Sequence, residues 1–255
     1  MFCVLIIQHR EKSFFEFLFG RFKRDTYDLK TVPVFKGAPF YVLTVTVGEK
    51  GADWDYIVQS VGKCAKRLVT ANHITVPECE GLGVFKSEML YNKMTENTFL
   101  HIIKNNYSRK KPFDICFIDK NAKHTDFLVK VSPYAFRITV ATDKKEEYSD
   151  TCDEIIESTG LCPSVQSAAA EAEVKICLDR RIMTVNTTQG FLNIGNGGDF
   201  TVPDIYSSLI PPKTDKYSFY AALYELCGVF DLGNCVFDVV EVNREKMSVD
   251  NVHFT

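Results

Sequence analysis

Short apolar runs alternate along this chain with longer segments in which apolar residues recur at helical spacing. Runs rich in β-branched and aromatic residues predict β-strands, and apolar residues three and four positions apart predict helices. The predicted strands are 2–8, 39–47, 73–77, 113–119, 137–143, 164–167, 173–179, 183–186 and 191–195. The predicted helices are 53–70, 87–105, 145–158 and 215–228. Asp53 is placed to cap the first helix, and Gly160 and Gly228 are placed to end the last two.

Alternation of strands with helical crossovers is typical of an α/β fold with a right-handed, mainly parallel sheet. Continuous apolar runs such as 113–119 agree with this, because strands of a parallel sheet are covered on both faces. We therefore predict an α/β fold with a mainly parallel sheet and flanking helices, in a chain of two domains or lobes. A chain of 255 residues is long enough for either one large domain or two smaller ones.

Residues 113–143 read as strand, loop, helix, strand and acidic residue, and this order resembles the βαβ unit of dinucleotide-binding folds. The resemblance makes the second half of the chain Rossmann-like, although the glycine fingerprint of that family is missing. Side chains at 120–124 stand where glycines would leave room for a pyrophosphate, so ordinary NAD binding is disfavoured. The acid that would accept the ribose hydroxyls is Asp143.

Ligands of open α/β sheets bind outside the carboxyl ends of the strands, where helix N-termini present free N–H groups. The strand-to-helix loop here contains Lys120, Asn121, Lys123 and His124, and Asp143 follows the next strand. These side chains suit a single phosphate or carboxylate better than a buried pyrophosphate. The candidate ligand is thus a small anionic metabolite or nucleotide. A purely structural alternative is that the lysines are solvated and Asp143 caps the following helix.

Charge differs between the two halves of the sequence. Residues 1–111 contain 17 Lys and Arg against 11 Asp and Glu, whereas residues 112–255 contain 13 against 22. We predict a basic N-terminal α/β lobe over 1–111 and an acidic Rossmann-like domain over 112–255, with the boundary at the basic run before Pro112. No nucleic-acid-binding motif accompanies the basic half, so a nucleic-acid partner is disfavoured.

Cysteine and hydropathy patterns bear on the compartment. The nine cysteines are an odd number without a CxxC pair, and the five histidines have no paired ligand spacing. This favours reduced thiols and disfavours a zinc or other metal site. No apolar run reaches the roughly 18 to 20 residues of a membrane-spanning helix, and the N-terminus lacks the pattern of a signal peptide. We predict a cytoplasmic protein without a transmembrane segment.

A phenylalanine-rich segment at 14–22 provides the second functional hypothesis. Its phenylalanines, at 14, 15, 17, 19 and 22, cover too much of a helix for a simple amphipathic face, so the segment should be buried or lie at an interface. Two hypotheses therefore remain. The chain binds a small anion at the 119–125 loop, or it is a non-catalytic interaction or scaffold protein, such as a homo-oligomer, that associates through 14–22. The sequence contains no recognised catalytic motif, so it leaves open whether the protein is an enzyme.

Overall fold

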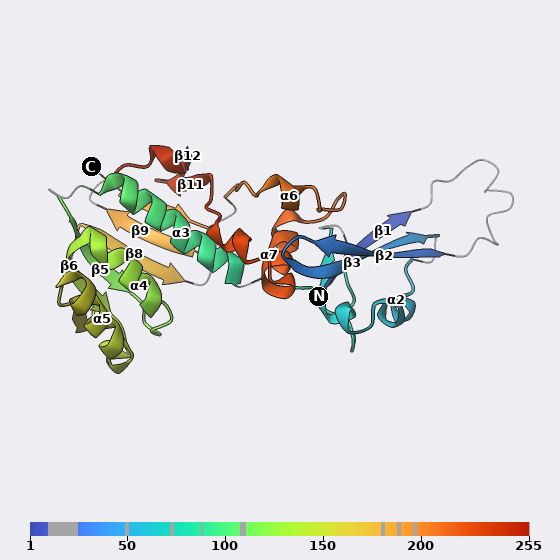
Figure 1. Cartoon of the computed structure of the whole chain (residues 1–255), viewed down its shortest axis with the longest axis horizontal. Coiled ribbons are helices and arrows are strands. Elements are labelled where there is room, and N and C mark those ends of the chain that lie inside the picture. The colour runs from blue at the N-terminus through green and yellow to red at the C-terminus, as the bar shows by residue number, and fades with distance from the viewer. Residues whose placement is uncertain are drawn as a thin grey trace. The chain divides into compact units, whose positions relative to one another are not determined.

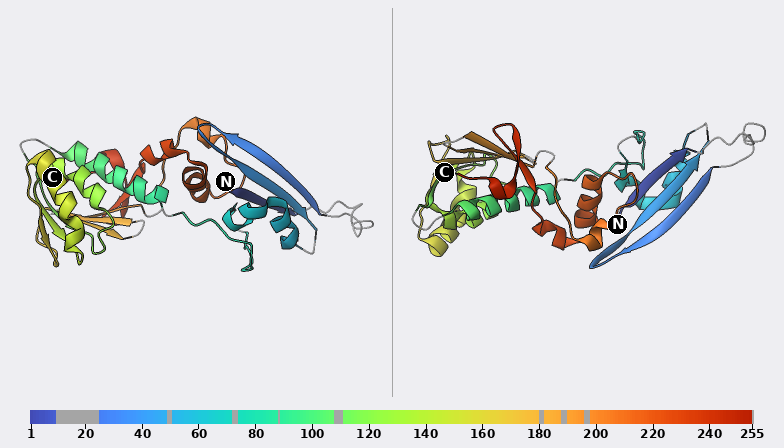
Figure 2. Two further views of the ribbon diagram at one scale, coloured as in Figure 1. Left: turned by 60° about the horizontal axis from the view of Figure 1, so that its bottom comes forward. Right: turned by 90° about the horizontal axis from the view of Figure 1, so that it is seen from above.

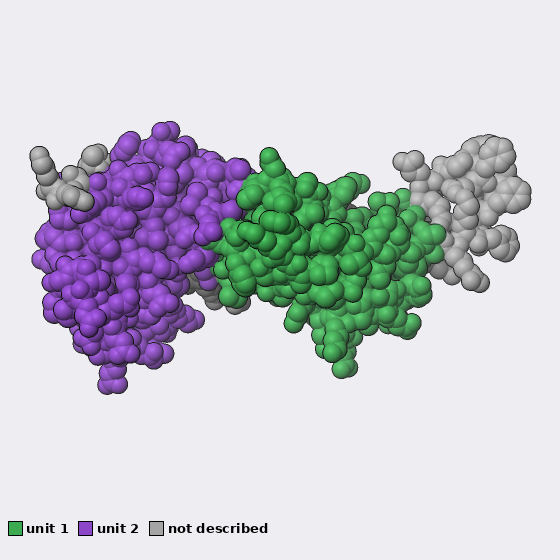
Figure 3. Space-filling model, in the orientation of Figure 1, with its two compact units in different colours: residues 1–90, 202–233 green, residues 91–201, 234–255 purple. Residues whose placement is uncertain are grey.

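Two β-sheets organise the chain, and each belongs to a separate compact unit (Figure 3). Unit 1 consists of Met1–Leu90 and Val202–Gly233, and unit 2 consists of Tyr91–Thr201 and Asn234–Thr255. The computed structural model describes residues 1–9, 25–48, 51–71, 74–87, 89–107, 111–179, 182–187, 190–195 and 198–254.

Unit 1 contains a four-stranded mixed sheet in the order β2-β3-β1-β4 (Figure 1). Strand β1 runs parallel to β3 and β4, and β2 runs antiparallel to β3. Its strands are β1 (Cys3–His9), β2 (Thr26–Val34), β3 (Gly37–Val47) and β4 (Leu68–Thr70). Its helices are α2 (Trp54–Val61), the 3-10 helix Gly62–Arg67, α6 (Asp204–Ser207) and α7 (Lys216–Cys227), and the 3-10 helix Phe230–Asn234 runs up to the end of the unit.

Alternate side chains of a strand point to opposite faces of the sheet, and both faces of this sheet are covered. Leu5 and Leu43 pack on one face in a cluster with Ile57 of α2. On the other face the rings of Phe2 and Phe40 stack with centroids 5.0 Å apart. The ring of Phe219 from α7 meets Phe2 at 6.0 Å and Phe40 at 5.4 Å. Helix α7 thus covers this end of the sheet.

Capping explains where α2 begins and ends. The Asp53 carboxylate accepts a hydrogen bond from the Tyr56 N–H at 3.1 Å, as its position in the sequence predicts. The predicted extension of this helix to residue 70 is wrong. Gly62 has a φ of 54°, which ends α2 at Val61, and the chain continues as the 3-10 helix and β4.

Unit 2 contains an eight-stranded sheet in the order β12-β11-β10-β9-β8-β5-β6-β7. Helices α3, α4 and α5 lie on one face of it (Figures 1 and 2). The strands are β5 (Phe113–Ile118), β6 (Ala135–Ala141), β7 (Ser164–Gln166), β8 (Val174–Asp179), β9 (Ile182–Thr187), β10 (Gly190–Ile194), β11 (Val239–Val242) and β12 (Glu245–Ser248). The helices are α3 (Met89–Asn106), α4 (Thr125–Val131), α5 (Ser149–Thr159) and the 3-10 helices Ser132–Tyr134, Lys145–Tyr148 and Val249–Asn251.

The predicted mainly parallel, Rossmann-like sheet is wrong. Strands β5 and β6 form the predicted parallel βαβ unit with helix α4 between them. Strands β7 and β8 extend it in parallel. Four other neighbouring pairs, from β8 to β12, are antiparallel. For β8, β9 and β10 the reason is the short distance along the chain: Asp179 pairs with Ile182, and Thr187 pairs with Gly190. A parallel crossover needs a dozen or more residues, so strands this close can pair only as hairpins.

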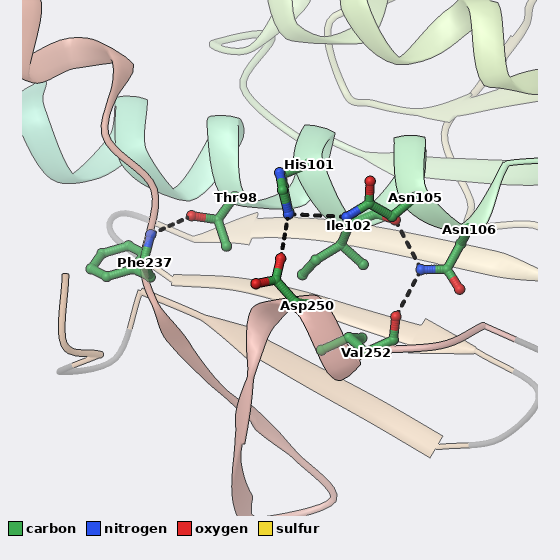
Figure 4. A network of polar contacts seen from close by, with 8 residues as sticks. All are labelled: Thr98, His101, Ile102, Asn105, Asn106, Phe237, Asp250 and Val252. Carbon is green, nitrogen blue, oxygen red and sulfur yellow. Dashed lines mark hydrogen bonds and ion pairs between the residues drawn. The ribbon is translucent and has the colours of Figure 1, made fainter. Parts of the chain in front are cut away.

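Helix α3 anchors the C-terminal segment of the chain in unit 2 (Figure 4). The side chain of Asn106 donates to the Val252 carbonyl at 2.8 Å and accepts from the Phe254 N–H at 2.7 Å. The buried Thr98 hydroxyl accepts from the Phe237 N–H at 2.9 Å. His101 Nε2 lies 2.9 Å from Asp250 Oδ1. Side chains of one helix thus satisfy backbone groups of the last segment, which lies far away in sequence.

The compact units redistribute the charge seen along the sequence. Residues 91–111, which belong to the basic half of the sequence, group with unit 2. Counted by unit, the sequence places 14 Lys and Arg against 14 Asp and Glu in unit 1, and 16 against 19 in unit 2. Neither unit therefore has a large net charge, and the contrast between basic and acidic halves is absent at the level of units.

The described residues contain no helix that is both long and apolar enough to cross a membrane. All nine cysteines are free thiols, and Cys3, Cys64, Cys116 and Cys227 are buried.

Candidate functional site

The turn from β5 to α4, where the sequence predicts a ligand site, is organised by the buried carboxylate of Asp119. Asp119 Oδ2 accepts a hydrogen bond from the His124 N–H at 2.8 Å and another from the Tyr148 hydroxyl at 2.9 Å. Burial, and after it the charge of Asp119, raises the pKa of Tyr148. A carboxylate of the chain itself therefore occupies the position beside the start of α4 that a bound anion would take.

The predicted site residues lie around this turn, but among the described residues no side-chain contact joins them to one another. Lys120, Asn121 and Lys123 are exposed and make no hydrogen bond or ion pair through their side chains with the described residues. Asp143 is also exposed, and its N–H donates to the Lys120 carbonyl at 3.3 Å. Backbone contacts thus bring the loops after β5 and β6 together, as expected for adjacent parallel strands.

His124 is the predicted site residue with a side-chain partner. It is the N-cap residue of α4, and its Nδ1 lies 3.4 Å from Oε1 of Glu96 on α3. Both side chains are about 15% exposed. Glu96 and His124 lie 28 positions apart and meet only in the folded chain, so no local sequence pattern identifies Glu96.

Two lysines lie beside this pair, and the sequence reasoning missed both. Lys93, one turn before Glu96 on α3, is half-buried, and Lys130 of α4 is exposed. Burial is the first cause that lowers the pKa of Lys93, and the neighbouring Lys130 lowers it further. Glu96 and Asp126 act in the opposite direction. We call Lys93, Glu96, His124, Asp126 and Lys130 the α3–α4 charged cluster.

Unit 1 carries a different kind of surface at the β2–β3 turn, which we call the aromatic patch: Phe35, Lys36, Phe230 and Asp231. Phe35 is 56% exposed and Phe230 is 72% exposed, the largest value among the large apolar side chains described. Lys36 Nζ lies 3.3 Å from Asp231 Oδ2 and 5.5 Å from the centroid of the Phe35 ring. One ion pair therefore joins the two segments that present the phenylalanines.

Close packing fixes the aromatic patch in place. A Cβ atom on Gly37, directly after the turn, would lie 2.8 Å from Val229 Cγ2, so only glycine allows this approach without a shift. The Phe230 ring rests edge-on against Tyr224 at 5.9 Å. The Tyr206 hydroxyl lies 3.4 Å from Asp231 Oδ2. The two phenylalanines are thus exposed on a backbone that is held from beneath.

The described residues contain no cluster of histidine, cysteine and acidic side chains suited to a metal ion. Comparison of the chain with family models, with curated protein sequences and with solved structures gives no match. The features of the described residues that bear on function are therefore the turn after β5, with the α3–α4 charged cluster beside it, and the aromatic patch.

Proposed function

We propose that the protein is an interaction protein that associates with a second copy of itself through the aromatic patch of unit 1. The observation that carries this proposal is the exposure of Phe35 and Phe230 on two segments joined by the Lys36–Asp231 ion pair. Single exposed apolar residues are common on protein surfaces. Phenylalanine is enriched at interfaces, and an aromatic centre with polar groups at its rim is the usual arrangement of an interface.

The patch suits a second copy because it is self-complementary. A two-fold interface brings the same surface together from both subunits, so each charge must meet its opposite. The patch contains one cation and one anion, and Lys36 of one copy can pair with Asp231 of the other while the phenylalanines pack between them. The backbone is already held by Gly37 and Tyr224, so little ordering free energy is lost on association.

The other hypothesis, binding of a small anion at the 119–125 loop, has weaker support. The carboxylate of Asp119 already accepts the hydrogen bonds at the start of α4. A phosphate entering this position would meet a negative charge. The predicted phenylalanine-rich segment 14–22 lies outside the described residues, so the aromatic patch is a separate surface for the same class of function.

Sedimentation equilibrium over a wide concentration range tests the proposal with the variants Phe35→Ser and Phe230→Ser. Aromatic residues at the centre of an interface contribute about 2 kcal/mol or more each, and a two-fold interface loses the ring from both subunits, so each variant should weaken association by about 700-fold or more. Phe136→Ser is the matched control, because Phe136 is 54% exposed on β6 of unit 2. It should leave association unchanged.

Two results would contradict self-association through the patch. A wild-type chain that stays monomeric at every concentration would exclude a second copy as the partner. An equal loss of association in Phe136→Ser and Phe230→Ser would show that exposed phenylalanines in general, and not this patch, drive it.

A further inference from the structure

The outer edge of strand β2 in unit 1 is a surface that the proposed function does not use. In the order β2-β3-β1-β4, β2 stands at the end of the sheet, and its hydrogen-bonded neighbour among the described strands is β3. The side chains of Asp28 and Lys30 are 58% and 70% exposed, and Leu29 between them is 43% exposed. The edge of such a strand presents N–H and C=O groups with which another strand can pair.

The charges of β2 restrict which strand can pair with this edge. Asp28 and Lys30 stand on either side of Leu29 and share one face of the sheet, where Lys30 Nζ lies 2.9 Å from Asp28 Oδ2. A strand with charges of one sign would repel its own copy, and natural proteins use such charges to protect their edges. The order in β2 is acid, leucine, base, and this order is complementary to itself when a second copy runs in the opposite direction.

We propose that β2 pairs in antiparallel direction with β2 of a second copy of the chain and so joins their two sheets into one. The two-fold axis passes through Leu29, which faces the same leucine of the other copy. Asp28 of each copy then lies opposite Lys30 of the other. Opposite-charge pairs across two strands stabilise their pairing, and each leucine gains an apolar neighbour that the sheet edge lacks.

The charges also select this register over its neighbours. Side chains directly opposite each other in an antiparallel pair lie on the same face, so a register is allowed only if each side chain keeps its face. An axis through Asp28 would bring the two aspartates together, and an axis through Lys30 would bring the two lysines together. Like charges directly opposite are destabilising. The register centred on Leu29 pairs residues 26–32 and ends before Pro33, which has no N–H to donate.

This contact is independent of the aromatic patch. Phe35 follows the end of β2, roughly 20 Å from Leu29 along an extended chain. A chain that uses both contacts has two different two-fold interfaces and binds two neighbours, so the assembly grows beyond a dimer. Removal of either contact leaves dimers that form through the other. The failure of one proposal is therefore distinguishable from the failure of the other.

Charge reversal tests the pairing in a Phe230→Ser parent, in which the aromatic patch is disrupted. Asp28→Lys and Lys30→Asp each replace two favourable pairs by two like-charge pairs, so each variant alone should self-associate about tenfold more weakly than the parent in sedimentation equilibrium. A mixture of the two variants should associate again, because every charge of one variant then faces its opposite on the other. Lys63→Asp, at an exposed position of the 3-10 helix Gly62–Arg67, is the matched control and should leave association unchanged.

Introduced cysteines test the register in the same parent. In Leu29→Cys the two new thiols face each other across the axis, where Cα atoms are about 4.5–5.5 Å apart and a disulfide can form. In the Thr31→Cys variant the corresponding Cα atoms are roughly 14 Å apart, because residue 31 lies opposite residue 27 of the other copy. Mild oxidation should therefore crosslink Leu29→Cys into a dimer and not Thr31→Cys. The parent itself controls for crosslinks through the native cysteines.

Three results would overturn pairing through β2. The first is a Phe230→Ser parent that is monomeric at every concentration. The second is a mixture of the two charge variants that associates no better than either variant alone. The third is equal crosslinking of Leu29→Cys and Thr31→Cys, which would exclude the register centred on Leu29.

Discussion

The aromatic patch of unit 1 and the 119–124 turn of unit 2 use their side chains in opposite ways. In the turn, Asp119 is buried and its hydrogen-bonding capacity is used within the chain by His124 and Tyr148. In the patch, Phe35 and Phe230 are exposed, and the burial that would stabilise them is not supplied within unit 1. Residue type alone therefore does not identify a binding surface. What identifies it is an interaction that the chain leaves unmade.

Alanine substitution of two phenylalanines in unit 1 should give the largest effect and sharpen this contrast. Phe219 is fully buried against Phe2 and Phe40, so Phe219→Ala should lower the free energy of unfolding by about 3–5 kcal/mol. Phe230→Ala removes an exposed ring and should change it by no more than about 0.5 kcal/mol. Denaturant unfolding at a concentration below that of self-association measures both. Similar losses in the two variants would show that Phe230 is a structural residue and would remove it from the patch.

The second prediction breaks the internal contacts of the 119–124 turn. Asp119→Ala leaves the Tyr148 hydroxyl and the His124 N–H without their acceptor, and this should cost about 2–3 kcal/mol of unfolding free energy. If the carboxylate stands where an anion would bind, inorganic phosphate should restore part of the stability of Asp119→Ala in a thermal unfolding experiment. Phosphate should not stabilise the wild-type chain.

Asp143→Ala is the matched control for that experiment, because it removes a carboxylate from the neighbouring loop that is exposed. It should lose little stability and gain none from phosphate. Stabilisation of the wild-type chain by phosphate, lost in a Lys123→Ala variant, would instead favour the anion-binding hypothesis.

Local patterns in the sequence predicted individual elements better than they predicted their pairing. Strands β1, β3, β5 and β6 and helices α3 and α7 lie where apolar periodicity places them, and Gly160 and Gly228 end their helices in the left-handed conformation. Two wrong predictions are local: residues 74–77 form no strand, and α2 stops at Gly62. The strand β2 was missed because its side chains are mostly exposed, so it has no apolar run.

The prediction of strand pairing was wrong for a different reason. Apolar runs such as 173–179 and 191–195 have the same appearance in a parallel and in an antiparallel sheet. The connections decide between the two, and two-residue connections were present in the sequence without the Asn-Gly or Asp-Gly pair that marks a tight hairpin. Asn243 and Arg244 connect β11 to β12, and their φ values of 50° and 73° suit a type I′ turn. This pair also lacks the glycine that marks such a turn in a sequence.

Only the parts of the candidate site that lie within one short stretch of sequence could be predicted. The 119–124 turn and the nearby Asp143 follow from one βαβ unit, whereas Glu96, Lys93 and Lys130 come together through the packing of α3 on α4. Asp119 was visible in the sequence as a turn residue. Its role depends on Tyr148, which lies 29 residues further along the chain and has no pattern that links it to the turn.

The smallest predicted effect concerns the alkaline titration of Tyr148 and asks how much of it is due to Asp119. Burial is the first cause that raises the pKa of Tyr148 above its ordinary value of 10.0, and the Asp119 charge is the next. A raised folded-state pKa contributes stability that is fully present below pH 10 and is lost as the pH rises through the folded-state value.

Asp119→Asn keeps a hydrogen-bond acceptor but removes the charge, so the pKa of Tyr148 should fall while staying above 10.0. Phenolate absorbance measures this, with Tyr148→Phe to assign the signal and Asp143→Asn as the control for loss of one exposed charge. If Tyr148 titrates identically in the wild type and Asp119→Asn, the carboxylate does not face the hydroxyl and does not fill the turn.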